Sequence, residues 1–507
     1  MAKNQTDHYR PSFEEFLQYA KRGNLIPVYR QILADFETPL SAYLKLEGRG
    51  PAYLLESVER GERLGRYSFI GATPSMVVES RGIEMWMKSS RQNKQWTTLT
   101  DPLRELEQIL SPYKSVSVPG LPRFSGGFVG YAGYEIVRFL EPIGPAKPDR
   151  LGVPDSVWFL SDSLVVFDHI EHVMKVVANA ILEPGSRATL EKRAKASYAK
   201  ATKRIDAMIR QLRQPLWYAP PAGRRELDGA SVHSNVSKAV FVKGVRRAKQ
   251  AIGQGEAIQI VLSQRFQVPA ACPSFEIYRA LRSLNPSPYM FYLNLGSFAL
   301  VGSSPEILVR CEDGKVEVRP IAGTRRRGKT PAADQQIEEG LRRDPKELAE
   351  HLMLADLGRN DIGRVCEYGS VQVNNLMTVE RYSHVMHLVS DVVGKLKKGK
   401  SAFDVFRAAF PAGTVTGAPK VRAMQIINEL EPDARGPYAG AVGYLSFNGN
   451  LDTCITIRTV LVKDGRAYVQ AGAGIVADSK PEQEYQETRN KAAGMIAAIR
   501  LAEQGLV

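Results

Sequence analysis

Short apolar runs with alternating polar positions dominate the first third of the chain. Residues 24–180 repeat such runs between turn signals, as in PAYLLES, RYSFIGA, SMVVES and DSLVVFD. This alternation is typical of β-strands that bury one face. The region 24–180 is therefore predicted to be rich in strands, and residues 1–23 before it are predicted to be an N-terminal tail.

The second half of the chain mixes strand-like runs with longer helical segments. A helix is predicted over 237–253, and runs such as AIQIVLSQRF, PYMFYLNL and KVEVRPIAG follow it. Asp-Gly or Asn-Gly pairs that begin at 313, 448 and 464 lie between apolar runs, which predicts hairpins and an antiparallel sheet. The predicted class is α+β rather than a doubly wound parallel fold.

Most of the positive charge lies between these two regions. The net charge is +14, and residues 186–250 carry 16 Lys and Arg against four Asp and Glu. This stretch contains no known nucleic-acid-binding motif, so a solvated helix face is favoured over a nucleic-acid surface. Residues 214–232 contain prolines without periodicity. Residues 181–234 are thus expected to be a basic helical connector and linker, which separates the region 24–180 from a second region at 235–507.

Composition and cysteine spacing exclude several classes of protein. The four cysteines, Cys272, Cys311, Cys366 and Cys454, are far apart and form no C-x-x-C pair, which argues against disulfide frameworks and cysteine zinc sites. The first residues contain no apolar signal-peptide core, and no uncharged apolar run reaches the ~20 residues that a membrane span needs. We expect a cytoplasmic protein that binds neither membranes nor nucleic acid.

The first of two acidic helices is predicted in the segment RDPKELAEHLMLADLGRND. Asp344 and Pro345 are typical of a helix start. Glu347 and Glu350 are three residues apart, so both side chains face the same side of this helix. Taken alone, such a pair is more often solvated than functional, because glutamate is a good helix former near a helix N-terminus.

The second acidic helix is predicted in DSKPEQEYQETRNK, with Ser479 as its cap. Glu484, Glu487 and Lys491 fall on one face of this helix. If the two acidic helices faced each other, four carboxylates would converge and would require a cation. Oxygen ligands in a chain with seven histidines favour Mg²⁺.

Two further segments could bind an anion. Gly323 and Thr324, in IAGTRRRG, offer backbone N–H groups and a hydroxyl after a strand. Thr414, in FPAGTVTGAPK, lies near a free helix N-terminus, although it could serve only as a cap. His384 and His387 lie three residues apart, and one of them could act as an acid or base.

Together these segments resemble the chorismate-utilising enzymes, and within that family the large subunits of anthranilate synthases. The resemblance rests on PIAGTRRRG, KELAEHLMLADLGRNDIGRV, FPAGTVTGAPKVRAMQII, GAVGYLSFNGNLDTCITIRT and QAGAGIVADSKPEQEYQET. It implies antiparallel sheets packed as a β-sandwich with helices outside, in which 24–180 is a tryptophan-binding N-terminal region and 235–507 is a chorismate-binding catalytic domain. It also implies a Mg²⁺-dependent lyase that converts chorismate and ammonia, through aminodeoxyisochorismate, to anthranilate and pyruvate in tryptophan biosynthesis.

The resemblance implies roles for individual residues. Glu350 and Glu487 would be metal ligands, directly or through water, supported by Glu347 and Glu484. Glu306, in GSSPEIL, matches a general acid that protonates the departing C4 hydroxyl, and burial near the other carboxylates would raise its pKa. The residues expected at the substrate are Gly323, Thr324, Thr414, Tyr438, Arg458, Gly472, Gly474 and Lys491.

Three positions bear on the reaction. Gln259 stands where water-adding relatives have a lysine base, which ammonia does not need, and Ala322 stands where aminodeoxychorismate synthases typically have a lysine. His387 matches a histidine linked to the second step, in which pyruvate leaves. The alternatives are an aminodeoxychorismate synthase component I of the folate pathway and, from another class, a non-catalytic nucleic-acid-binding protein.

The resemblance also implies partners. No cysteine has the G-x-C-x-G setting of a glutaminase nucleophile, so a separate glutaminase subunit is expected to supply ammonia, in a heterotetramer of two large and two small subunits. LLES and NPSPYMF resemble a pocket for tryptophan as a feedback inhibitor, which would be an allosteric site. The residues expected there are Glu56, Ser57, Pro288, Tyr289 and Met290.

Overall fold

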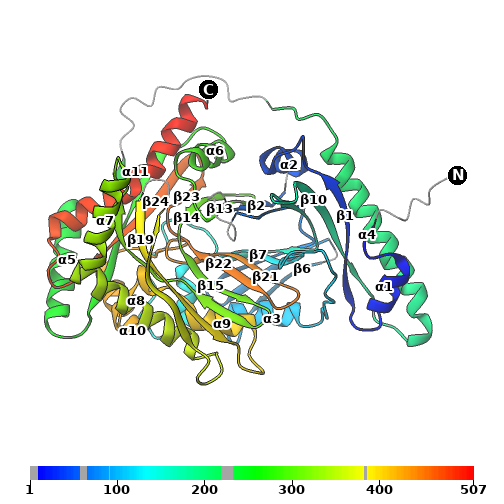
Figure 1. Cartoon of the computed structure of the whole chain (residues 1–507), viewed down its shortest axis with the longest axis horizontal. Coiled ribbons are helices and arrows are strands. Elements are labelled where there is room, and N and C mark those ends of the chain that lie inside the picture. The colour runs from blue at the N-terminus through cyan, green and yellow to red at the C-terminus, as the bar shows by residue number, and fades with distance from the viewer. Residues whose placement is uncertain are drawn as a thin grey trace.

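Two large antiparallel sheets lie against each other, and helices cover their outer faces (Figure 1). The computed structural model describes residues 9–48, 50–57, 65–90, 92–218, 232–381 and 385–506, without the side chains of Arg187 and Thr324. Within these residues each sheet has 12 strands. The predicted α+β class and the sandwich of antiparallel sheets are confirmed.

Sheet A contains strands from residues 235–507 at one end and strands from residues 24–180 at the other. Its order is β1 (Leu25–Leu33), β10 (Val173–Ile181), β9 (Ser163–Asp168), β3 (Tyr67–Ala72), β2 (Ala52–Glu56), β13 (Tyr289–Asn294), β14 (Ala299–Ser304), β23 (Thr459–Lys463), β24 (Arg466–Ile475), β12 (Gln259–Pro269) and β11 (His233–Ser234), with β20 (Gly417–Ala418) on β12.

Sheet B also combines strands from both regions of the chain. Its order is β17 (Ile321–Arg326), β19 (Val385–Lys395), β16 (Lys315–Val318), β15 (Ile307–Glu312), β22 (Leu451–Ile455), β21 (Ala441–Ser446), β7 (Gly127–Ala132), β8 (Ser156–Ser161), β4 (Met76–Arg81), β5 (Glu84–Ser89) and β6 (Asn93–Thr97), with β18 (Gln372–Arg381) on β19.

Helices pack on both sheets and at the ends of the sandwich. They are α1 (Phe13–Tyr19), α2 (Pro39–Leu46), α3 (Pro102–Leu110), α4 (Leu190–Leu212), α5 (Lys238–Gly253), α6 (Ser274–Leu284), α7 (Pro331–Arg343), α8 (Pro345–Gly363), α9 (Ala402–Ala409), α10 (Lys420–Leu430) and α11 (Pro481–Gln504), with short 3₁₀ helices η2 (Tyr134–Phe139), η3 (Arg187–Thr189) and η4 (Gly413–Val415). No helix of the described segments is long and apolar enough to cross a membrane.

The predicted regions 24–180 and 235–507 meet inside both sheets. β2 pairs with β13, which places Glu56 opposite Met290, and β7 pairs with β21. One hydrophobic cluster includes Leu54 from the first region and Tyr444 from the second. The two regions therefore share one core, and residues far apart in the sequence can line one cavity.

The predicted N-terminal tail and the predicted connector both contain helices that pack on the rest of the fold. Residues 1–23 contain α1, whose Phe16 is fully buried and packs on Tyr198 of α4 with ring centroids 5.1 Å apart. From Phe13 onwards this stretch is therefore part of the fold. The basic connector contains α4, and residues 219–231 of the predicted linker lie outside the described residues.

Several local predictions are confirmed and one is wrong. Ser237 caps α5, and the Asp344 carboxylate caps α8 by accepting from the N–H groups of Lys346 and Glu347. The predicted cap at Ser479 is wrong, since Pro481 occupies the first helical position of α11 and Lys480 is the N-cap. The Ser479 hydroxyl instead accepts from the Val476 N–H at 3.1 Å, in the turn before the helix.

Candidate active site

Two side-chain contacts join the elements that carry the predicted site residues. Gln259 Nε2, at the start of β12, donates to Glu350 Oε1 of α8 at 3.1 Å. Lys491 Nζ of α11 donates to the Gly472 carbonyl of β24 at 3.1 Å. Because β12 and β24 are neighbours in sheet A, these contacts bring α8 and α11 to the same end of that sheet.

Two glycines open one face of β24 at this point. A Cβ on Gly472 would lie 2.6 Å from Tyr438 Oη, and a Cβ on Gly474 would lie 2.8 Å from Gln259 Nε2. Residues two apart on a strand face the same side, so both glycines serve one surface. Only glycine at these positions lets Tyr438 and Gln259 approach the strand, which fits a surface where a ligand touches the backbone.

The starts of the two acidic helices interact electrostatically. Burial raises the pKa of the Glu484 carboxyl, and the charge of Glu487 adds to this rise. Ser479, Lys346 and Lys491 oppose it. Lys346 belongs to α8 and Glu484 to α11, so charges at the starts of the two helices act on each other.

The four predicted metal-binding carboxylates nevertheless have separate partners. Glu347 pairs with Arg325 at 2.8 Å, and Glu487 pairs with Lys491 at 2.7 Å. In the part of the chain that the structure describes, no three His, Cys, Asp or Glu side chains could hold a metal ion between them. The structure therefore does not bring the four carboxylates into one cluster.

The donor set still fits Mg²⁺ in kind. This ion is usually bound through one or two carboxylates, with water and an anionic substrate as its other ligands, so a preformed cage is not required. Glu350 Oε1 already has the Gln259 amide beside it, and Gln259 Oε1 is buried without a hydrogen-bond partner in the structure. A buried oxygen that lacks a partner is a group that a ligand would satisfy.

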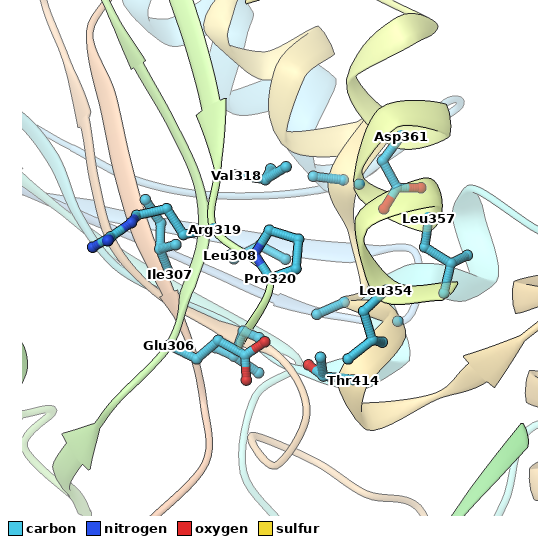
Figure 2. A pocket seen from close by; sticks show the side chains of 15 residues that line it. Glu306, Ile307, Leu308, Val318, Arg319, Pro320, Leu354, Leu357, Asp361 and Thr414 are labelled. Atoms are coloured by element: carbon cyan, nitrogen blue, oxygen red, sulfur yellow. The ribbon is translucent and has the colours of Figure 1, made fainter. Parts of the chain in front are cut away.

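Glu306 lies just before β15 and is 9% exposed. Burial raises the pKa of its carboxyl to about 7, while Thr414, Arg458 and Lys491 oppose the rise. Figure 2 shows the carboxylate and the Thr414 side chain pointing toward each other beside a cavity. The expected rise in pKa is confirmed, but burial alone causes it, because the charged neighbours that act on Glu306 are cations.

His387 lies in β19, between Thr324 of β17 and Glu380 of β18. Burial lowers the pKa of its imidazole to about 4, and Arg458 adds to this effect. At neutral pH the ring is therefore neutral and can accept a proton. The positive charge of Arg458 lowers the pKa of both Glu306 and His387. The acid and the neutral base therefore lie in the electrostatic field of the same guanidinium.

The remaining predicted residues are placed as follows. Gly323 has φ +61° at an irregular point of β17, and a Cβ there would lie 3.2 Å from Glu347 Oε2. Thr414 lies in η4, and its hydroxyl is buried without a hydrogen bond of normal length. The side chain of Thr324 and all of His384 lie outside the described residues.

Sequence reasoning missed Arg435, which organises this end of the molecule. Arg435 is 2% exposed and donates to the carbonyls of Val415 and Val261 at 2.7 and 2.8 Å. Its guanidinium also lies 5.5 Å from the centre of the Tyr438 ring. It forms a buried ion pair with Glu431, and because both residues lie beyond the end of α10, no helical spacing indicated this contact.

A second cavity, of about 390 Å³, lies between the two sheets. Tyr289 Oη donates to Asp452 Oδ1 at 2.9 Å and accepts from Arg310 Nη2 at 3.0 Å. Glu56 accepts hydrogen bonds from Tyr278 and Arg282. All the residues predicted for regulation line this cavity: Glu56, Ser57, Pro288, Tyr289 and Met290.

The lining of this second cavity combines apolar side chains with both signs of charge. Aromatic and aliphatic groups are supplied by Phe69 and Met290, while Arg310 and Asp452 supply opposite charges. The Ser57 hydroxyl is buried without a hydrogen-bond partner in the structure. Such a lining suits an amino acid with a large apolar side chain, because its two charged groups need opposite partners.

The site as a whole can support acid–base chemistry on an anionic substrate. Glu306 has a pKa near neutrality, as a general acid requires. Arg458 and Lys491 provide positive charge beside it, and arginine can bind a carboxylate through two hydrogen bonds. The glycines of β24 expose backbone groups next to these cations.

Comparison with known proteins gives a consistent result. The family model described as chorismate binding enzyme matches residues 50–497. Anthranilate synthase component 1 of Synechocystis is 48% identical over 511 residues, which cover 97% of this chain and 99% of that protein. The same component of Acetivibrio thermocellus is 46% identical over 498 residues, again covering 97% of this chain and 99% of the relative.

Solved structures share the fold. Anthranilate synthase component I from Streptococcus pneumoniae TIGR4 superposes with a TM-score of 0.74 at 37% identity, over 92% of this chain and 98% of that chain. MenF, the menaquinone-specific isochorismate synthase from Escherichia coli, has a TM-score of 0.66 at 21% identity, over 96% of this chain and 98% of that chain, which shows a common fold.

Proposed function

The chain belongs to the chorismate-binding enzyme family, and we propose that it is the large subunit of an anthranilate synthase. It converts chorismate and ammonia to anthranilate, pyruvate and water. The residue at position 259 favours ammonia over water as the nucleophile. Gln259 donates to Glu350, and glutamine at this position provides no base to activate water. Ammonia needs no such base, because it is already a nucleophile.

Glu306 acts first. In its protonated form it donates a proton to the C4 hydroxyl of chorismate, which leaves as water while ammonia adds to C2. The new ammonium group then loses a proton, so the product aminodeoxyisochorismate is formed by a net exchange of hydroxyl for amine. A carboxyl with a pKa of about 7 is suited to this role, because it is still protonated near neutral pH.

His387 supports the second step. Removal of the C2 proton and cleavage of the bond between C3 and the enolpyruvyl oxygen give the aromatic ring of anthranilate, and the enolpyruvate takes up a proton to become pyruvate. The imidazole of His387 has a pKa lowered to about 4, so at neutral pH its ring is unprotonated and has a lone pair available for the C2 proton. Arg458 lies near enough to act on this ring and binds a substrate carboxylate.

The residues around Glu306 and the glycines of β24 bind the substrate. Arg458, Tyr438, Lys491 and the backbone of Gly472 bind its carboxylates, and Gly323, Thr324, Thr414 and Gly474 complete the site. Mg²⁺ would be held by Glu350 and Glu487, with Glu347 and Glu484 beside them, and it would neutralise the ring carboxylate of chorismate.

A separate glutaminase subunit supplies the ammonia. Burial raises the pKa of each of the four cysteine thiols, so none of them resembles the reactive thiolate of a glutaminase. The small subunit joins the large one in a heterotetramer with two copies of each. Tryptophan binds the cavity between the sheets and inhibits the enzyme.

The test is anthranilate fluorescence from the purified chain with chorismate, Mg²⁺ and an ammonium salt. Fluorescence that requires Mg²⁺, is lost with EDTA and is suppressed by tryptophan supports the whole proposal. An E306Q variant is the control for a reaction at this site. Consumption of chorismate with aminodeoxychorismate as the product, identified by mass spectrometry, would contradict it, and so would a lack of turnover even with a glutaminase subunit.

A further inference from the structure

One side chain closes the base of the loop that carries Thr414. Residues 410–419 join α9 to α10. Lys420 Nζ, at the first residue of α10, donates to the Ala409 carbonyl at 3.4 Å and to both carboxylate oxygens of Asp361 at 2.7 Å. Because Asp361 belongs to α8, a single ammonium joins the two ends of the loop and ties them to that helix.

The same face of α8 runs from this ion pair to the proposed metal site. Glu350, Leu354, Leu357 and Asp361 follow one another at spacings of four, three and four residues, so they lie on one side of the helix. Leu357 Cδ1 is 2.8 Å from where a Cβ on Gly413 would lie, so the loop rests directly on this face.

The loop reaches the general acid across a small cavity. Leu354, Leu357 and Asp361 project from α8 at one side of it, and Glu306 and Thr414 lie at its end (Figure 2). From the side of sheet A, Arg435 Nη1 holds the loop by donating to the Val415 carbonyl at 2.7 Å. Thr414 therefore lies between these two side-chain contacts, which hold the loop in addition to the pairing of β20 with β12.

The two side-chain contacts differ in what else they support. Arg435 also binds Val261 of β12 and Glu431, so its loss would disturb the core. The hydrogen bonds that the structure gives the Lys420 ammonium go to Asp361 of α8 and to Ala409 at the start of the loop. The side chains of Lys420 and Asp361 are 13% and 15% exposed, so solvent screens this pair only weakly.

We propose that Asp361 and Lys420 are positioning residues, which hold the loop 410–419 so that the Thr414 hydroxyl lies against the Glu306 carboxyl. This inference rests on the proposed function, in which Glu306 is the general acid. Neither residue of the pair touches the substrate. Their effect on the reaction is indirect, because loss of one charge leaves the other buried and unpaired, and the loop then moves.

The test begins with D361N, which keeps the shape of the side chain and removes its charge. We expect kcat for anthranilate formation to fall about 10-fold or more, because small displacements of a catalytic contact cost up to about 100-fold, while KM for chorismate changes by less than about threefold. K420R keeps the charge and should retain more activity than K420M. E256Q breaks the half-exposed pair with Arg422 on the same helix α10, and should leave kcat and KM unchanged.

The pH profile separates positioning from general damage. The Thr414 hydroxyl opposes the rise in the Glu306 pKa, so T414V should move the alkaline fall of kcat to higher pH. D361N should move it in the same direction. The double variant T414V/D361N should move it no further, because the pair acts through Thr414. A structural loss of active enzyme would lower kcat without moving this limb.

Folding is checked by circular dichroism for every variant. If D361N does not fold, D361N/K420M takes its place, since it removes both charges and leaves none unpaired. A folded variant with the kcat and alkaline limb of the wild type overturns the positioning role. Failure of the proposed function would be a different result, because the wild type itself would then form no anthranilate.

Discussion

Cys454 and Ile455 are neighbours on β22, and they line two different cavities. Cys454 lines the cavity between the sheets, which also contains Tyr289, whereas Ile455 lines the cavity beside Glu306. The Ile455 N–H also donates to the Glu306 carbonyl at 3.0 Å. Since successive residues of a strand face opposite sides, β22 is a wall common to both cavities, and a ligand that shifts this strand would shift the general acid.

A Y289F variant tests the proposed tryptophan cavity. The Tyr289 hydroxyl connects Asp452 and Arg310, two oppositely charged groups in the lining of the cavity. Loss of one buried hydrogen bond costs about 1 kcal/mol, so we expect the concentration of tryptophan that halves the activity to rise about fivefold, with kcat unchanged.

The matched control for Y289F is Y292F. Tyr292 lies on the same strand, β13, but its hydroxyl bonds to Ser274 and it is absent from the lining of the cavity. Its inhibition by tryptophan should remain that of the wild type. Inhibition is measured by anthranilate fluorescence at increasing tryptophan concentrations. If Y289F and Y292F changed the inhibition equally, tryptophan would not act through this cavity.

The alkaline side of the pH profile should report Glu306. The reaction uses the protonated acid, and the pKa of Glu306 is raised to about 7, so kcat should be constant at lower pH and fall as the pH rises through about 7. E306Q should lower kcat by about 10² to 10⁴ and abolish this limb. The measurement needs a constant concentration of un-ionised ammonia, because the nucleophile itself titrates. An E306Q profile with the same limb would assign it to another group.

Local structure was predictable because its signals lie within a few residues. The Asp313-Gly314 turn joins β15 to β16, and Asp344 caps α8, both as predicted. The burial of Phe16 was not visible, because it depends on α4, almost two hundred residues later in the chain. Patterns of alternation cannot indicate which distant element will cover a given side chain.

The site residues that belong to sequence motifs were predictable. Those that reach the site only through the packing of distant elements were missed. The resemblance of two separate motifs predicted that Glu56 and Met290 line one cavity. It did not predict that their strands pair, because strand pairing over this distance leaves no local signal. Arg435, Asp361 and Lys420 were missed, because charged residues are usually solvated and only the tertiary structure buries these three.

An H387N variant should separate the two steps of the reaction. Without the neutral imidazole, the first step continues and aminodeoxyisochorismate accumulates, while anthranilate formation falls by about 10² to 10⁴. Chromatography with mass spectrometry would follow both compounds. H172N is the control, because His172 is exposed and its positive φ of +53° suits asparagine. Anthranilate formation at the wild-type rate in H387N would exclude a role for this residue.

The contact between Gln259 and Glu350 can be tested through a glycine. Ala at position 474 fits the backbone of β24, but its Cβ would lie 2.8 Å from Gln259 Nε2 and would push that amide away from Glu350. We expect G474A to lower kcat/KM for chorismate by about 10- to 100-fold, because the carboxylate next to the substrate loses its position. The concentration of Mg²⁺ that gives half-maximal activity should rise as well, since Glu350 is a proposed ligand.

The control for G474A lies on the acidic helix of the same site. Gly494 of α11 is exposed, and a Cβ there would meet nothing within 4 Å. G494A should therefore leave kcat/KM unchanged and stabilise α11 by about 1 kcal/mol, because alanine is the better helix former. Wild-type kcat/KM and Mg²⁺ dependence in a folded G474A enzyme would show that the Gln259–Glu350 contact is not required. If kcat/KM fell equally in G474A and G494A, the cause would be reduced stability of the strand and the helix rather than a change at the site.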